Sequence, residues 1–216
     1  MTQIKICGIT RIEDALCAAE SEADAIGFIF HPTSPRYITP KRAKEIIAAL
    51  PREIVTVGVF VNRNAEEVMQ TVKGCGLDLI QLHGDESPEY CRRFPPERII
   101  KAVFPRTPEE LPSLKTYNVL AFLIDFREVG RCGGTGKRAD WELAARLAKE
   151  RPLILAGGLN IGNIEEALAA VKPRAVDINS GIEQEAGIKD HDRMKRIISL
   201  IRNQEKGGQL PIFVRP

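Results

Sequence analysis

Two side chains capable of acid–base chemistry each end a short strand-like run. Cys7 ends the run Gln3–Cys7, and Asp125 ends the run Leu120–Asp125. A free thiol has a pKa of about 8.5, so we expect a neighbouring group, either Lys5 or the N-terminus of a helix, to favour the thiolate, which can act as a base. A carboxyl group among apolar neighbours has a raised pKa, which suits a general acid. The pair predicts proton-transfer chemistry, and a small buried cysteine with a capping aspartate is the structural alternative.

Two glycine-containing turns have the composition of an anion site. Gly157 and Gly158 follow one apolar run directly, and Ser180 and Gly181 follow the next one. Glycine lets the backbone approach a ligand closely and present its N–H groups. A helix expected at Ile161–Val171 would add its positive end at the same place. These turns predict a phosphate site, and an ordinary tight turn between strand and helix is the alternative.

A third glycine-rich stretch, CGGTGKRADW, lies between the acidic residue and these turns. Gly134, Gly136 and Ala139 match the dinucleotide pattern G-x-G-x-x-A, but the stretch does not follow a strand directly. Arg138 stands where a P-loop requires serine or threonine. We therefore expect Gly134, Thr135 and Gly136 to cover an anion with their N–H groups.

Three further polar residues are candidates for substrate contacts. Arg36 lies in the loop HPTSPRYI, where its guanidinium can bind a carboxylate through two parallel bonds, although a solvated arginine is the alternative. His83, in QLHGDE, can contact a substrate or serve as a hydrogen-bonded structural histidine. Asp177, in AVDINSGIE, is also expected to contact the substrate.

The elements that must position these residues are eight strand-like runs alternating with eight helix-like runs. The strands are expected at Gln3–Cys7, Ala25–Phe30, Ile54–Val61, Leu79–Leu82, Ile99–Val103, Leu120–Asp125, Leu153–Ala156 and Ala175–Ile178. The helices are expected near Ile12–Ser21, Pro40–Leu50, Ala65–Gly74, Pro88–Phe94, Pro108–Tyr117, Trp141–Glu150, Ile161–Val171 and His191–Asn203. Short, continuously apolar strands are typical of a parallel sheet buried on both faces.

Eight such units in 216 residues predict an α/β protein with a single (βα)8 TIM barrel, spanning residues 1–205. A doubly wound open sheet is the alternative, but its five or six strands would leave units over. The tail, residues 206–216, either docks on the barrel or is disordered.

A closed barrel would bring the candidate residues to one end. Active sites of this fold lie at the carboxyl ends of the strands, and strands six, seven, eight and one are consecutive neighbours. A phosphate held after strands seven and eight would then have Cys7 on one side and Asp125 on the other. Because side chains alternate along a strand, Lys5 and Cys7 share a face, which we expect to be the interior. This layout favours isomerisation of a sugar phosphate by proton transfer, without metal or cofactor.

Composition argues against several other functions. The chain is 44% hydrophobic and 28% charged with a net charge of +2, so nothing indicates binding to nucleic acid or to an anionic membrane. No apolar run approaches the roughly 18 residues of a membrane helix, and MTQIKICGIT lacks the apolar centre of a signal peptide. The five cysteines contain no C-x-x-C pair, and the three histidines lack metal-ligand spacing. We expect a cytoplasmic protein that is a monomer rather than a homodimer.

The motifs KICGIT, QLHGDE, LIDF, GGTGKRADW, LAGGLN and VDINSGIE together resemble phosphoribosylanthranilate isomerase, a family of tryptophan biosynthesis. They occur in order up to about Asn203. The resemblance implies a cytosolic, cofactor-free (βα)8 barrel. Its reaction would be the Amadori rearrangement of N-(5-phosphoribosyl)anthranilate to 1-(2-carboxyphenylamino)-1-deoxyribulose 5-phosphate. It further implies that Cys7 is the general base, Asp125 is the general acid and Arg36 lies by the anthranilate moiety.

Two positions depart from the family pattern. Ala139 stands where phenylalanine is usual, and Asn179 stands where serine is common. Both concern the walls of the expected phosphate site, and neither affects the acid or the base.

Two rival interpretations are weighed against this one. One is another barrel enzyme that acts on a sugar phosphate. An epimerase would need metal ligands at its strand ends, and a histidine-pathway isomerase would need an aspartate in place of Cys7. Indoleglycerol-phosphate synthase would need a set of catalytic lysines. A non-catalytic phosphate-binding protein would keep the glycine turns without needing Cys7 and Asp125 together. The presence of both residues favours the isomerase.

Overall fold

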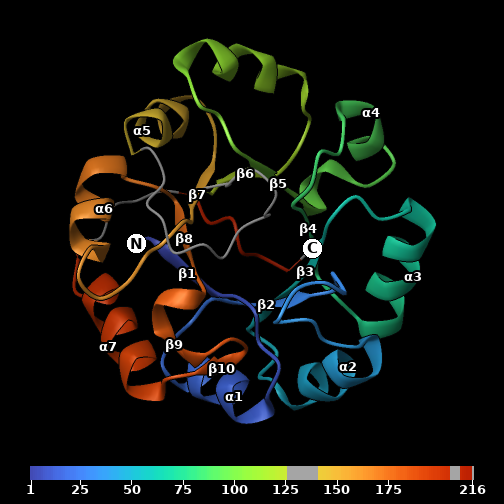
Figure 1. The fold of residues 1–216 in the computed structure, drawn as a ribbon, viewed down its shortest axis with the longest axis vertical. Helices are drawn as coiled ribbons and strands as arrows, with labels where there is room; N and C mark the ends of the chain where they lie inside the picture. The colour runs from blue at the N-terminus through green and yellow to red at the C-terminus, as the bar shows by residue number, and fades with distance from the viewer. Residues whose placement is uncertain (126–140, 205–209, 216) are drawn as a thin grey trace.

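Eight parallel strands close into a barrel surrounded by helices in the computed structural model, which describes residues 1–125, 141–204 and 210–215 (Figure 1). The strands are β1 Gln3–Ile6, β2 Ala25–Ile29, β3 Val55–Phe60, β4 Leu79–Leu82, β5 Ile99–Val103, β6 Ala121–Ile124, β7 Leu153–Leu155 and β8 Ala175–Ile178. Lys5 of β1 pairs with Ala25 on one side and with Asp177 on the other, so β8 closes the sheet against β1. The predicted (βα)8 barrel is confirmed, and the open sheet is excluded.

The helices follow the strands in the expected order. They are α1 Ile12–Glu20, α2 Pro40–Ala49, α3 Ala65–Cys75, α4 Pro88–Cys91, α5 Trp141–Glu150, α6 Ile164–Val171 and α7 His191–Arg202. Short 3-10 helices occur at η1 Pro96–Arg98, η2 Pro108–Thr116 and η3 Ser180–Ile182, and a hairpin is formed by β9 Glu183–Glu185 and β10 Ile188–Lys189. Helix α7 buries Met194, Ile197, Ile198 and Ile201, a spacing that forms one apolar face toward the sheet.

Local capping signals start several helices. The side chains of Thr39 and Ser87 accept hydrogen bonds from N–H groups three residues later, and a proline takes the first helical position after each. Three expected helices differ from prediction. The fifth, expected as Pro108–Tyr117, is a 3-10 helix that contains Pro112, whose missing N–H and ring are incompatible with an α-helix interior. The fourth is a single turn, and the helix expected from Ile161 begins at Ile164.

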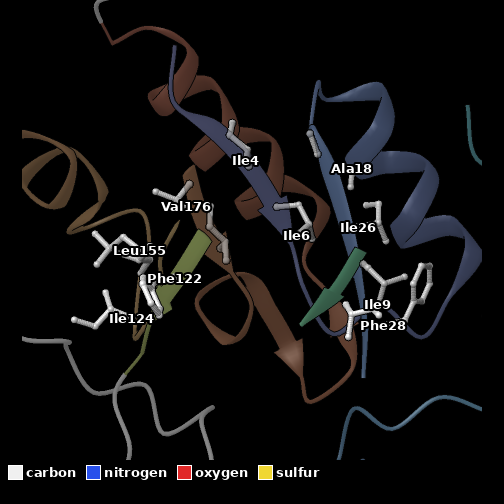
Figure 2. Packing of buried hydrophobic residues seen from close by; sticks show 14 of the residues in the cluster. Ile4, Ile6, Ile9, Ala18, Ile26, Phe28, Phe122, Ile124, Leu155 and Val176 are labelled. Atoms are coloured by element: carbon white, nitrogen blue, oxygen red, sulfur yellow. The ribbon is translucent and has the colours of Figure 1, made fainter. Parts of the chain in front are cut away.

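Buried side chains form two layers, one on each side of the sheet. Ile4 and Ile6 of β1 point outward and pack beside Ile26 of β2 and Ala18 of α1 (Figure 2). The opposite faces of the strands fill the barrel interior with a second cluster that includes Val57, Ile100, Leu123 and Ile154. Alternation along β1 therefore directs Lys5 inward, as the sequence predicts.

The described residues of the tail lie at the amino ends of the strands. Ile212 and Phe213 are buried and belong to the interior cluster. In Figure 1 the red terminal segment crosses the middle of the barrel. Among the described residues, no helix is long and apolar enough to cross a membrane.

Candidate active site

Cys7 lies at the carboxyl end of β1, where the chain turns sharply away from the barrel. Its N–H donates to the carbonyl of Ile178 on β8 at 2.9 Å, and its side chain is buried. Gly8 follows with a φ of 71°, a conformation that favours glycine. A Cβ at Gly27 of β2 would lie 2.8 Å from Cys7 Sγ and 2.9 Å from Lys5 Nζ. Glycine at that position therefore provides the space that the thiol and the ammonium group share.

Lys5 and Asp177 form a buried ion pair beside the thiol. Lys5 Nζ donates to Asp177 Oδ1 at 2.7 Å, and the exposed fractions of the two side chains are 0% and 8%. Burial lowers the pKa of Lys5, but the charges of Asp177 and Cys7 more than offset that effect and raise the pKa above its ordinary value. Lys5 is therefore a permanent cation next to Cys7.

The thiol itself is not activated in the way the sequence suggests. Burial raises the pKa of Cys7 and Asp177 raises it further, while Lys5 and Lys189 lower it only in part. The expectation that Lys5 makes the thiolate the favoured form is therefore wrong in net effect. Near neutral pH the thiol form predominates, and any thiolate that forms is a stronger base than an ordinary one.

Asp125 lies just beyond β6 and faces a histidine from β4. Asp125 Oδ2 is 3.4 Å from His83 Nε2, and both side chains are about nine-tenths buried, with exposed fractions of 13% and 11%. His83 Nδ1 is 2.9 Å from the amide nitrogen of Gln81, two residues earlier on the same face of the strand. With this amide donating to Nδ1, the neutral ring carries its proton on Nε2, toward Asp125. His83 is thus placed to orient the carboxyl group, and Gln81 to orient His83.

The loop that carries His83 is held rigidly. Glu86 accepts hydrogen bonds from the N–H groups of Asn62 and Gly84, and it forms an ion pair with Lys101 Nζ at 3.0 Å. Both charged side chains are buried. Lys101 Nζ also donates to the carbonyl of Gly84 at 2.8 Å. These contacts fix the turn HGDE against β5, so the imidazole has little freedom to move away from β6.

Arg36 is buried in the loop after β2 and is already engaged by a carboxylate. Its Nε and Nη2 donate to the two oxygens of Glu183 at 2.9 Å and 2.7 Å. Glu183 also accepts from Lys189 Nζ at 3.0 Å. Burial raises the pKa of Glu183, but Arg36 and Lys189 more than offset that effect and lower it. Only the Nη1–Nη2 edge of the guanidinium is therefore left for a substrate carboxylate.

The two glycine turns lie against each other. Gly157 and Gly158 have φ values of 85° and 68°, and in the described part of the chain their N–H groups are not bound to a backbone carbonyl. The side-chain amides of Asn160 and Asn163 both donate to the carbonyl of Gly158, which holds the turn. A Cβ at Gly181 would lie 1.9 Å from the carbonyl oxygen of Leu159, so the second turn packs directly on the first.

The predicted site residues fall into two groups on either side of these turns. Cys7 follows β1, Arg36 lies in the loop after β2, and Asp177 lies in β8 just before Ser180 and Gly181. Asp125 and His83 come from the ends of β6 and β4. Three of the expected phosphate ligands, Gly134, Thr135 and Gly136, lie outside the described residues, as does Ala139.

Sequence reasoning missed Gln81, Glu183 and Lys189. Spacing offered a signal for Gln81, because it is two residues before His83 and so shares a face with it. Glu183 belongs to the motif VDINSGIE, but nothing local marks it as the partner of Arg36. Among the described residues, no group of three or more His, Cys, Asp or Glu side chains could hold a metal ion.

Fold and site together define a class of protein, a (βα)8 barrel with a buried thiol and a carboxyl group on either side of two adjoining glycine turns. Residues 4–200 match the family model described as N-(5'phosphoribosyl)anthranilate (PRA) isomerase. The N-(5'-phosphoribosyl)anthranilate isomerase of Syntrophus aciditrophicus (strain SB) is 52% identical over 205 residues, which make up 95% of this chain and 89% of that protein.

Solved structures agree. A phosphoribosyl anthranilate isomerase in complex with reduced 1-(o-carboxyphenylamino)-1-deoxyribulose 5-phosphate matches with a TM-score of 0.83 and 39% identity, over 94% of this chain and 100% of that one. Monomers of the dimeric phosphoribosylanthranilate isomerase from Thermotoga maritima match with a TM-score of 0.83, 38% identity and the same coverage. The chain belongs to the N-(5'-phosphoribosyl)anthranilate isomerase family and is an isomerase, which confirms the assignment made from its motifs.

Proposed function

We propose that Cys7 and Asp125 are the general base and general acid with which this chain isomerises N-(5'-phosphoribosyl)anthranilate to 1-(2-carboxyphenylamino)-1-deoxyribulose 5-phosphate. The observation that carries the proposal is the closure of β8 on β1, because it puts the thiol and the carboxyl group on opposite sides of the β7 and β8 turns. Both side chains stand where the strands of a barrel present an active site.

The reaction divides into two proton transfers. Asp125 gives its proton to the ribose ring oxygen, the bond from that oxygen to C1 breaks, and the anthranilate nitrogen supplies electrons to form a protonated Schiff base. The Cys7 thiolate then takes the proton from C2, and the electrons of that bond move toward the iminium nitrogen. The enolamine gains a proton at C1 as the C2 hydroxyl becomes a ketone. The iminium of the substrate itself is the electron sink, so the reaction requires no cofactor.

Three groups hold the substrate in this proposal. The free Nη1–Nη2 edge of Arg36 binds the anthranilate carboxylate, and its partner Glu183 keeps that edge turned toward the site. The N–H groups of Gly157, Gly158, Ser180 and Gly181 bind the phosphate, since the left-handed conformation of the two glycines supports a turn rich in free donors. Gly134, Thr135 and Gly136 remain predicted phosphate ligands.

His83 and Asp177 remain predicted substrate-binding residues. Their neighbours support an additional role for each: His83 orients Asp125, and Asp177 neutralises Lys5 beside the thiol. A positioning role is compatible with substrate contact, because each of these buried residues keeps a small exposed fraction, 9% for His83 and 8% for Asp177.

The roles of Cys7 and Asp125 are tested by replacing each one. Cys7→Ser and Asp125→Asn should each lower kcat about 10²–10⁴-fold, the usual contribution of a general acid or base. Turnover is followed by the loss of fluorescence as phosphoribosylanthranilate, generated in situ, is consumed. Cys17→Ser is the matched control, because Cys17 is also buried but lies on α1, and its turnover should be normal. If Cys7→Ser turned over at the normal rate, the assignment of the base would be wrong.

We also propose that the protein acts as a monomer in the cytoplasm. The large hydrophobic side chains exposed among the described residues are Met1, Tyr37, Met69, Leu210 and Val214, which is little apolar surface for an obligate dimer interface. The described cysteines are free thiols, as a reducing compartment maintains them. Light scattering after size exclusion should give a mass near 24.0 kDa, and a value near twice that mass would contradict the monomer.

A further inference from the structure

The barrel floor, meaning the end at which the strands begin, has small side chains where such barrels are normally filled. Ala25, Ala121 and Ala175 are the first residues of β2, β6 and β8, and all three face the interior. Layers contributed by alternate strands normally consist of bulky branched residues, so alanine at these positions leaves space at the floor. An open apolar space there would be costly to expose to water.

Two residues of the carboxyl-terminal segment 210–215 occupy this region. Ile212 and Phe213 are 2% and 5% exposed and belong to the same interior cluster as the three alanines. Their neighbours Leu210 and Val214 are 74% and 52% exposed. The segment therefore inserts a specific apolar pair, while its other apolar side chains remain in solvent.

The segment is also recognised through its backbone. Oε1 of the Gln3 side chain accepts the N–H groups of Ile212 and Phe213 at 2.6 Å and 2.8 Å. The amide nitrogen of Gln3 donates to the carbonyl of Phe213 at 3.0 Å. One primary amide thus satisfies three main-chain groups of the segment, which is how proteins bind extended peptides regardless of their side chains.

A third contact fixes the end of the segment. Nη2 of Arg215 donates to the carbonyl of Ile54 at 3.2 Å, and its Nε lies 3.6 Å from Asp78 Oδ2. Ile54 and Asp78 immediately precede β3 and β4, so this arginine and Gln3 of β1 anchor the segment across one side of the floor. The segment is thus held by burial of its apolar pair, by a side-chain amide that binds its backbone and by a charged anchor, which together make a built site.

We propose that the barrel floor is a binding site for an extended peptide with an adjacent Ile-Phe pair, and that residues 210–215 of the same molecule occupy it. The site is at the opposite end of the barrel from Cys7 and Asp125, and the segment that occupies it lies beyond residues 4–200, which the family model matches. Its role does not depend on the proposed acid–base assignments, and its occupation stabilises the barrel without taking part in catalysis.

The first test compares two substitutions in the full-length chain. Phe213→Ala removes a buried aromatic ring and should lower Tm by on the order of 10 °C. Val214→Ala is the matched control, because that side chain is exposed, and it should shift Tm by less than about 2 °C. Both variants should keep normal kcat and KM well below their Tm. Equal Tm values for the two variants would overturn the proposal.

The second test asks whether the floor holds the segment without a covalent link. A protease site replaces residues 205–209, and the protein is folded first and then cut. The released segment should co-elute with the barrel on size exclusion, and an excess of a fluorescent peptide QLPIFVRP should replace it. The same peptide with alanine in place of Phe213 should replace it at least 10-fold less effectively. If the cut segment elutes by itself, the floor is not a peptide site.

The third test concerns which molecule supplies the segment. Occupation within one molecule predicts a Tm that does not change with protein concentration and a monomer that persists at high concentration. Exchange of segments between two copies predicts a Tm that rises with concentration together with a dimer, and that result would overturn the intramolecular arrangement.

Discussion

Replacing Asp177 by asparagine should destabilise the protein far more than the loss of an ordinary ion pair. Lys5 is 0% exposed, and its ammonium group donates to Asp177 Oδ1 at 2.7 Å. Removing one partner of a buried pair leaves an uncompensated charge and costs about 3–5 kcal/mol. We expect Asp177→Asn to lower the free energy of unfolding by that amount at pH 7. The measurement is the shift of the urea midpoint, with the slope of the transition checked for constancy.

Two controls test the origin of this effect. Glu45→Gln removes the exposed pair with Arg42, whose side chains are 46% and 48% exposed, and should cost no more than about 1 kcal/mol. The double replacement Lys5→Met with Asp177→Leu removes both charges, so it should cost less than the sum of the two single replacements by at least 1 kcal/mol. Additive costs, or a cost of Asp177→Asn below that of the exposed control, would refute the reasoning.

The pH dependence gives an independent check of the sign. In the unmodified protein the pKa of Lys5 is raised above its unfolded value, so its stabilising contribution is complete below the unfolded pKa and is lost as pH rises through the folded pKa. In Asp177→Asn burial dominates and lowers the folded pKa of Lys5. Stability should then increase as pH rises from that lowered value toward the unfolded pKa. A variant whose stability fell over this alkaline range would contradict the assignment.

Three further predictions concern the site. His83→Ala should lower kcat by up to about 10²-fold, because the carboxyl group that it faces loses its orientation, and rapid kinetics with circular dichroism will separate this effect from misfolding. Glu183→Gln should raise KM more than it lowers kcat in steady-state assays, since Arg36 loses the carboxylate that directs its free edge. A change confined to kcat would argue against this role of Glu183. Lys5→Met should raise the pKa of Cys7 further, because it removes a charge that lowers that pKa. The rate of Cys7 alkylation by iodoacetamide should therefore rise at a higher pH than in the unmodified protein. A rise at lower pH would disprove the role of Lys5.

Much of the scaffold follows from local signals. The apolar runs and the cap–proline pairs Thr39-Pro40 and Ser87-Pro88 place strands and helices to within a few residues. The order of βα units is enough to predict closure and therefore which strand ends meet. The exceptions are also local in cause: Pro112 turns an expected α-helix into a 3-10 helix.

The site was predictable only as far as residue types and strand ends allow. Cys7, Asp125 and the glycine turns can be found because each stands directly after a strand. Their electrostatic environment cannot be found in this way. Glu183 meets Arg36 from 147 positions along the chain, and no periodicity connects the two.

The sequence by itself determined the order of elements, the barrel and the identity of the residues that stand at its carboxyl edge, because these depend on patterns within about ten neighbouring residues. Only the tertiary structure decided how those residues are charged and held. Asp177 lies against Lys5 and offsets the lowering of the Cys7 pKa that the ammonium group alone would cause. Glu183 binds Nε and Nη2 of Arg36. The tertiary structure also decided where the tail goes, because Phe213 packs in an apolar cluster that includes alanines from three separate strands. Burial and the meeting of distant charges set these properties, and both exist only after the chain has closed.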